Sequence, residues 1–345
     1  MDNREELYKR FRIFAVPIYY LQRIYALWRT ETAQLTTAVV GTIVIGLAAY
    51  RFAFFIWSFI RPSTLQRYCH VGTGSWAVVT GATDGIGRAW ADELSNRGFN
   101  VLLHGRNPEK LNRVKKELAA KYPRRTLDTV VADASKSDHP EQALLDKVNQ
   151  LPGKLVILVN NVGGAVVSPA YQTHAAMAPS SIDTVLNTNA RFPVQLTSLL
   201  LPILKENKPA LILNCGSATA NFGIPYLAAY SGTKALIEGF TRSLDAELEC
   251  EGLGKDIEVK CLTINNTRSA GNKTEMPVFT IDAGELVRGS LGKVGDGEVI
   301  EFGHWRHAVQ AFVVGLLPGR VLRGYLLDQM RMRKAVEEEE VAKSR

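Results

Sequence analysis

The sequence predicts an α/β protein in which a doubly wound parallel sheet forms a single domain after an N-terminal transmembrane helix. Three observations predict it. Residues 35–60 form an almost unbroken apolar run, a glycine-rich turn at residues 80–87 joins a strand to a helix, and strands alternate with helical patterns as far as residue 262. Such alternation gives parallel strands with helices on both faces of the sheet.

The composition narrows the function classes. The 345 residues are 46% hydrophobic, which excludes a disordered protein, and 41 Lys and Arg against 34 Asp and Glu give a net charge of +7. The basic residues form no stripe with interleaved aromatic residues, so we expect no nucleic-acid partner. The 4 cysteines have no close pairs, which excludes a zinc pattern and a disulfide scaffold and favours a reducing compartment. We expect no metal site.

The apolar run at residues 35–60 contains a single charged residue, Arg51. As a helix it would be roughly 39 Å long, enough to cross a hydrocarbon core of about 30 Å. Arg51 lies in its C-terminal part, from which a long side chain can reach the interface. A cleaved signal peptide, the alternative, would be shorter, begin earlier and end at small residues. We therefore predict a retained transmembrane helix.

Residues 1–34, before this helix, are predicted to be an amphipathic segment. Within them, residues 7–28 mix large apolar residues with basic ones, as in a helix that lies in the membrane interface. A short helix packed on the soluble domain is the alternative. Residues 61–74 are predicted to be a linker. The charges that flank the apolar run do not determine its orientation.

The domain begins with a predicted strand at residues 75–80, followed by a glycine-rich turn that leads into a helical pattern. Glycines here let the backbone turn tightly and approach a pyrophosphate, which binds the free N–H groups at the start of the helix. Strand, turn and helix together are typical of a Rossmann-type dinucleotide site. The candidate cofactor-binding residues of this turn are Gly81, Thr83, Asp84, Gly85, Ile86 and Gly87.

The second strand, at residues 101–104, is followed by Arg106. NAD enzymes place a carboxylate here for the ribose, whereas an arginine can bind the 2′-phosphate, so we predict NADP(H) as the cofactor. A solvated turn residue is the alternative for Arg106. Asp133, after a later strand, either accepts from the adenine amine or caps the next helix. Further elements are predicted as helices at 108–121 and 141–150 and strands at 129–131, 155–159, 210–214 and 257–262.

Three segments of the chain occur in a diagnostic order: Thr80-Gly81-x-x-x-Gly85-Ile86-Gly87, Asn160-Asn161-Val162-Gly163 and Tyr230-x-x-x-Lys234. Together they resemble the ordered signatures of the short-chain dehydrogenase/reductase family over roughly residues 74–264. The resemblance implies a Rossmann sheet and hydride transfer between a nicotinamide and an alcohol or carbonyl carbon.

Tyr230 and Lys234 lie four residues apart in a predicted helix and therefore share one face. An ammonium beside a phenol favours loss of the phenolic proton, which a general acid/base near neutral pH requires. A Tyr and a Lys on an exposed helical face are the alternative. By the resemblance, Lys234 also holds the nicotinamide ribose, Ser217 hydrogen-bonds the substrate oxygen, and Asn189 supports a water chain to the lysine. Asn187 is the alternative register for Asn189.

The resemblance also assigns Asn160 and Gly163, at the end of the fourth strand, to the ribose and nicotinamide side. After the strand at 257–262 the family usually has a proline-containing loop over the nicotinamide. This chain has Ile264 at that position. Thr267 and Ser269 are the candidate replacements for the cofactor contacts of that loop.

The joint at residues 61–87 and the loop at residues 103–111 resemble one branch of the family, the endoplasmic-reticulum very-long-chain 3-oxoacyl-CoA reductases and the 17β-hydroxysteroid dehydrogenases. This resemblance implies a single-pass protein of the endoplasmic-reticulum membrane whose NADP-binding domain, residues 75–302, faces the cytosol. It would reduce a 3-oxoacyl-CoA with Tyr230 as general acid. A hydroxysteroid dehydrogenase or a secondary-metabolite ketone reductase is the alternative in this fold, and an inactive membrane scaffold is the alternative of another class.

The partners expected from this resemblance are a hydrophobic acyl-CoA or other lipid ketone, the membrane, and either a second copy of the chain or other lipid-elongation enzymes. Residues 303–345 are predicted to form amphipathic helices that contact the membrane or line a substrate entrance, and a charged tail. Ordinary core helices are the alternative. Pro318 and Gly319 interrupt the apolar part. Sequons at Asn265 and Asn272 would be glycosylated only if the domain were lumenal.

Overall fold

The structure is a computed structural model that describes residues 19–20, 22–23, 25–26, 30–70, 74–268 and 278–343. The chain divides into two compact units, Met1–Ile60 and Arg61–Arg345. In the first unit, helix α2 (Glu31–Ile60) is long and apolar enough to cross a membrane. It begins earlier than the apolar run because Thr30 accepts a hydrogen bond from the backbone N–H of Ala33 and starts the helix. The predicted interfacial helix at 7–28 lies mostly outside the described residues.

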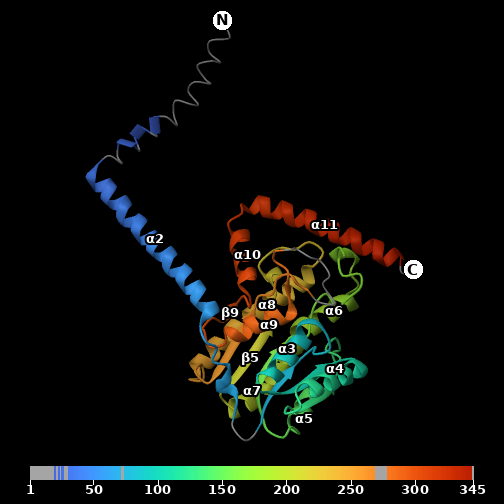
Figure 1. Cartoon of the computed structure of the whole chain (residues 1–345). Coiled ribbons are helices and arrows are strands. Elements are labelled where there is room, and N and C mark those ends of the chain that lie inside the picture. The colour runs from blue at the N-terminus through green and yellow to red at the C-terminus, as the bar shows by residue number, and fades with distance from the viewer. Residues whose placement is uncertain are drawn as a thin grey trace. The chain divides into compact units, whose positions relative to one another are not determined.

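The second unit contains a seven-stranded sheet whose strand pairs are all parallel, in the order β3-β2-β1-β4-β5-β6-β9 (Figure 1). The strands are β1 (Ser75–Val79), β2 (Asn100–Gly105), β3 (Leu127–Val131), β4 (Lys154–Asn160), β5 (Ala210–Cys215), β6 (Ile257–Leu262) and β9 (Ile300–Glu301). The order reverses between β1 and β4, which creates a topological switch point at their carboxyl ends. The predicted doubly wound α/β fold is confirmed.

Helices cover both faces of this sheet. The longer ones are α3 (Gly85–Asn96), α4 (Pro108–Lys121), α5 (Glu141–Val148), α6 (Pro179–Leu186), α7 (Phe192–Glu206), α8 (Ala228–Cys250) and α9 (Ala283–Gly292). On β1, Ala77 and Val79 belong to a buried cluster shared with α3, α4 and α9, whereas Trp76 and Val78 belong to one shared with α5, α7 and α8. Alternate residues of one strand thus feed two cores, as a doubly wound sheet requires.

The chain ends in two further helices, α10 (Trp305–Gly315) and α11 (Gly319–Lys343). The break between them contains Pro318, at the position where the sequence predicts an interruption. The predicted charged tail is helical as far as Lys343. A second, two-stranded parallel sheet joins β7 (Thr267–Arg268) to β8 (Ile281–Asp282) just before α9.

The stretch predicted as a linker is packed into the second unit over its first part. Leu65 and Tyr68, in the short 3-10 helix η1 (Leu65–Tyr68), are fully buried in the core shared with α3 and α9. Ser63 donates from its hydroxyl to the carbonyl of Leu291 at 2.5 Å, and Tyr68 donates to the carboxylate of Glu258 at 2.6 Å. This stretch is therefore part of the domain and not a free spacer.

Candidate active site

The carboxyl ends of β1 and β4 are joined through Thr80. Its backbone N–H donates to the carbonyl of Val159 at 3.0 Å, and its hydroxyl accepts from the N–H groups of Asn161 and Val162 at 2.8 and 3.0 Å. The Asn161 amide donates back to the Thr80 carbonyl at 2.9 Å. These bonds hold the two strand ends together at the switch point. Neither side chain is predicted as a site residue from the sequence, although both lie in the segments that carry the family resemblance.

The glycine-rich turn lies against this junction. Gly81 has a φ of +66°, and a Cβ on Gly87 would lie 2.0 Å from the carbonyl oxygen of Gly81. Only glycine therefore lets α3 begin so close to the strand ends. Asp84 caps α3 by accepting from the N–H of Gly85 at 2.7 Å. The backbone cradle at the start of α3 fits the pyrophosphate of a dinucleotide.

The two remaining predicted cofactor-binding residues of the turn, Thr83 and Ile86, pack against their neighbours. Thr83 lies beside Gly105 at the end of β2. A Cβ on Gly105 would lie 3.0 Å from the methyl group of Thr83. Ile86 is partly buried against the core beneath α3. Both side chains thus pack the turn against the rest of the domain.

Arg106 and Asp133 lie just beyond the ends of β2 and β3. Arg106 is exposed. Partial burial acts to raise the pKa of Asp133, but hydrogen bonds from Ser135 and the charges of Arg106 and Lys136 outweigh it, so the pKa lies below its usual value. The pair therefore presents a cationic side chain beside an ionised carboxylate at the edge expected to receive the adenosine part.

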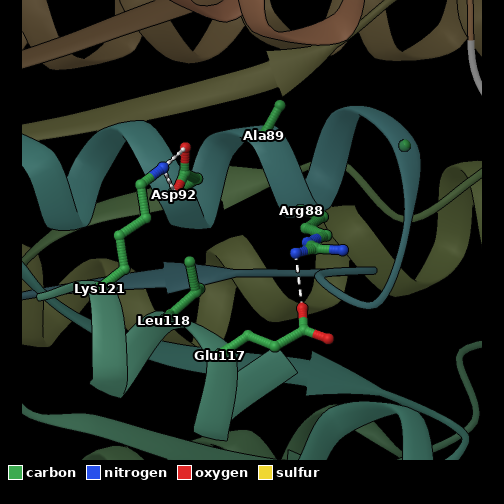
Figure 2. Close-up of a pocket in the computed structure, with 7 residues that line it drawn as sticks. Arg88, Ala89, Asp92, Glu117, Leu118 and Lys121 are labelled. Atoms are coloured by element: carbon green, nitrogen blue, oxygen red, sulfur yellow. Dashed lines mark hydrogen bonds and ion pairs between the residues drawn. The ribbon is translucent and has the colours of Figure 1, made fainter. Parts of the chain in front are cut away.

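A surface groove of about 420 Å³ runs between α3 and α4 from Gly85 (Figure 2). Arg88 pairs with Glu117 across it at 2.5 Å, and Lys121 pairs with Asp92 at 2.7 Å. These charges neutralise one another within the groove. None of the predicted catalytic side chains lines it, so we assign the chemistry elsewhere.

Tyr230 and Lys234 lie one turn apart near the start of α8. The Lys234 ammonium, whose side chain is buried, is 5.7 Å from the centre of the Tyr230 ring and donates to the carbonyl of Cys215 at 2.7 Å. Cys215 ends β5, and Ser217 follows two residues later as the cap of the 3-10 helix η4 (Ala218–Ala220), which packs against α8. Lys234 therefore ties the helix that carries the phenol to the strand end that carries Ser217.

Asn189 lies in a π-helical turn, η3 (Asn187–Arg191), between α6 and α7. Such a turn widens the helix locally and is frequent at functional sites. The Asn189 amide donates to the carbonyl of Gly164 at 3.0 Å and accepts from its N–H at 2.8 Å. A Cβ on Gly163 would lie 2.6 Å from Asn189 Oδ1 and 3.3 Å from Lys234 Nζ. Because Gly163 has no side chain, Asn189 and Lys234 can both lie close to its backbone.

The alternative register is not supported by this geometry, because the Asn187 amide points away and donates to the carbonyl of Ser135 at 3.0 Å. Asn160 is placed differently from the expectation. It is buried, and its amide donates at 2.8 Å to the side chains of both Thr197 and Asn214. It connects β4 to α7 and β5 beneath the site.

The segment after β6 lies beside Ser217, because the carbonyl of Ile264 accepts from the N–H of Ala218 at 3.0 Å. Thr267, a predicted cofactor contact, is buried in β7 and its hydroxyl donates to the carbonyl of Asn265 at 3.3 Å. Ser269 and Asn272 lie outside the described residues. Among the described residues of this loop, the Ile264 backbone is therefore the part that is hydrogen-bonded next to Ser217.

A cavity of about 90 Å³ opens beside Tyr230. Most of its lining is apolar and includes Ala165, Val167, Met177 and Leu227. Tyr230 thus lines a space that can hold a hydrophobic group. A proton donor beside an apolar cavity, with a buried ammonium behind it, suits the reduction of a carbonyl on a hydrophobic molecule.

Comparison with known proteins agrees with this geometry. The family model described as short chain dehydrogenase matches residues 75–277. The very-long-chain 3-oxoacyl-CoA reductase-B of Danio rerio is 34% identical over 74% of this chain and 79% of its own length. The very-long-chain 3-oxoacyl-CoA reductase of Neurospora crassa is 30% identical over 85% of this chain and 89% of its own.

Among solved structures, a metagenomic short-chain oxidoreductase in complex with NADP is 25% identical, with a TM-score of 0.56 over 67% of this chain and 96% of that one. The match to the family model covers more than half of the chain, and it includes the glycine-rich turn, Ser217, Tyr230 and Lys234. The chain belongs to the short chain dehydrogenase family and is an oxidoreductase that acts on CH–OH or C=O groups.

Proposed function

We propose that this protein is a membrane-anchored NADPH-dependent ketoreductase that converts a long- or very-long-chain 3-oxoacyl-CoA to the 3-hydroxyacyl-CoA. The observation that carries the proposal is that Tyr230 lines a mostly apolar cavity and has the buried Lys234 ammonium 5.7 Å from the centre of its ring. The curated relatives described above are named for this reaction.

The chain's own residues account for the proton and the orientation of the substrate. NADPH, when bound, supplies the hydride. The Tyr230 hydroxyl donates its proton to the carbonyl oxygen as negative charge develops there, and the Ser217 hydroxyl donates a hydrogen bond to the same oxygen. The Lys234 ammonium favours the phenolate left behind. Asn189, which lies with Lys234 beside Gly163, supports the return of a proton to Tyr230.

The cofactor assignment rests on the site's charges and shape. The cradle at Gly81 to Gly87 would hold the pyrophosphate, and Arg106 would bind the 2′-phosphate that distinguishes NADP(H) from NAD(H). Asp133 would accept from the adenine. The solved short-chain oxidoreductase of like fold carries NADP. We therefore take NADP(H) as the cofactor.

The membrane assignment rests on α2 and on the turn between α10 and α11. Phe312, in the last turn of α10, and Leu316, just after it, are 68% and 69% exposed, and Val321, near the start of α11, is also exposed. Arg320 and Arg323, near the start of α11, flank Val321 in the sequence. Apolar side chains flanked by basic ones suit the surface of a bilayer with anionic headgroups. We place the protein in the endoplasmic-reticulum membrane, with its domain on the cytosolic side.

A substrate panel tests the proposal. The full chain in detergent should oxidise NADPH with long-chain 3-oxoacyl-CoAs, followed by the loss of nicotinamide absorbance, and Tyr230→Phe should lower kcat by at least about 10³-fold with NADPH binding retained. Lys110→Ala, a change at an exposed position on α4, is the control for effects of mutagenesis and purification. Turnover of cyclic ketosteroids with none of the acyl-CoAs would overturn the substrate assignment, and an active Tyr230→Phe would overturn the catalytic one.

A further inference from the structure

Helix α11 contacts one wall of the cavity beside Tyr230 through Glu337. The Glu337 carboxylate accepts from the backbone N–H groups of Ala170 and Tyr171 at 2.6 and 2.8 Å. Ala170 is itself part of the cavity lining. Figure 1 shows the C-terminal end of α11 beside the loop that precedes α6. An ionised carboxylate thus holds two adjacent amides of this wall by charge-assisted hydrogen bonds.

The same helix contacts a second part of the cavity lining through Lys334. The Lys334 ammonium lies 5.2 Å from the centre of the Tyr226 ring, and Tyr226 also lines the cavity. Tyr226 has a φ of +65°, which a bulky residue adopts only when its surroundings hold it there. Tyr226 precedes Tyr230 by four residues and lies two residues before the start of α8. Its position therefore affects where α8 begins and where the Tyr230 side chain lies.

Lys334 and Glu337 are three residues apart and share one face of α11. Lys334 is further aligned by an ion pair with Glu338 at 3.2 Å. One face of a single helix therefore contacts two segments of the cavity lining, residues 165–177 and 226–230, which are far apart in the sequence. We call these two segments the walls of the cavity.

We propose that Lys334 and Glu337 are positioning residues that clamp the two walls of the substrate cavity and so set how it receives the acyl chain. The identity of the ligand, an acyl chain, rests on the proposed function. The contacts that form the clamp do not depend on that function. Neither side chain takes part in proton or hydride transfer. Loosening the clamp should weaken the binding of long substrates while the chemistry at Tyr230 proceeds.

Hydrogen exchange on the full chain in detergent tests the clamp itself. Glu337→Ala should speed exchange of the Ala170 and Tyr171 amides about tenfold or more, and Glu337→Gln, which keeps a neutral acceptor, should have a smaller effect. Glu339→Gln is the matched control, because Glu339 lies on the same helix and pairs only loosely with Lys343, at 3.9 Å, in solvent. Unchanged exchange in both Glu337 variants would overturn the clamp.

Steady-state kinetics then test its role. Glu337→Gln and Lys334→Met should raise KM for a long-chain 3-oxoacyl-CoA about fivefold or more, leave kcat within about twofold and leave NADPH affinity unchanged. A short-chain substrate should show a smaller rise. Equal KM values for variants and control would refute the positioning role. Altered exchange in a protein that reduces no acyl-CoA would uphold the clamp and refute the proposed substrate, so the two failures are distinguishable.

Discussion

Arg106 stands exposed just after β2, at the sheet edge that carries the glycine-rich turn. A guanidinium at this place should bind a phosphate by charge-assisted hydrogen bonds. Arg106→Ala should therefore raise KM for NADPH about tenfold to a hundredfold and leave KM for NADH almost unchanged, measured by nicotinamide absorbance. Arg113→Ala, an exposed change on α4, should behave as the wild type. Equal losses with both cofactors would show that Arg106 does not read the 2′-phosphate.

At the residue scale, sequence spacing predicts those site residues whose partners are close along the chain. Tyr230 and Lys234 share one helical face, and the structure brings them together as predicted. Thr80 has its partner far along the chain in β4, and Asn160 has its partners in α7 and β5. A single sequence carries no pattern for such contacts. The role of Asn160 as a buried connector therefore emerges only from the folded structure.

At the scale of elements, β6 and β9 are joined by a buried ion cluster. Lys260 on β6 is 1% exposed and pairs with Asp296 at 2.5 Å and Glu301 at 3.3 Å. Burial raises the pKa of Glu301 to about 7, against the opposing charges of Lys260 and Lys293 and with the help of Asp296. This cluster attaches the short edge strand to the sheet and holds a carboxyl that titrates near neutral pH.

Because the folded pKa of Glu301 lies above its unfolded value of 4.5, the group contributes stability that is fully present below that value and is lost as pH rises through about 7. The free energy of unfolding of the wild type should therefore fall relative to that of Glu301→Gln as the pH rises from 5 to 8. The slope should be at most about 1.4 kcal/mol per pH unit. Groups common to both proteins cancel in this difference.

Melting of both full chains in detergent at several pH values measures this difference. Glu298→Gln, a change of the same kind at an exposed carboxylate beside the cluster, should run parallel to the wild type. A difference between wild type and Glu301→Gln that is constant with pH would show that Glu301 is ionised throughout, held by the two lysines.

Elements differ in how far the sequence predicts them. Helix α4 has the bounds predicted because Asn107 caps it, Pro108 begins it, and buried Leu111, Val114 and Leu118 recur at helical spacing. Strand β9 was not predicted, since two residues carry no periodicity. The packed stretch around Leu65 was not predicted either, because its burial depends on α9, which lies over 200 residues further along the chain.

At the scale of the whole molecule, one of the two sequons cannot report on topology. The Asn265 amide donates to the Gln310 side chain at 3.0 Å and to the carbonyl of His307 at 3.4 Å. Thr267, the third residue of this sequon, is 3% exposed. A folded domain would therefore hide Asn265 even in the lumen, so an unmodified Asn265 does not report on orientation. Modification of Asn272 would indicate a lumenal domain.

The chain's own cysteines offer a direct measure of orientation. Cys250, at the end of α8, is exposed, whereas burial raises the pKa of Cys215 to about 11 and of Cys261 to about 12 and keeps these thiols protonated. Burial also raises the pKa of the half-buried Cys69. A maleimide that reacts through the thiolate should therefore modify Cys250 first.

With the domain on the cytosolic side and α2 as the anchor, a membrane-impermeant maleimide should label the full chain in sealed microsomes without detergent. Cys250→Ser should remove most of that label, which assigns it to this thiol, and alkaline carbonate should leave the protein in the membrane pellet. Labelling that appears only after detergent opens the vesicles would place the domain in the lumen. Release by carbonate would instead show that α2 does not span the bilayer.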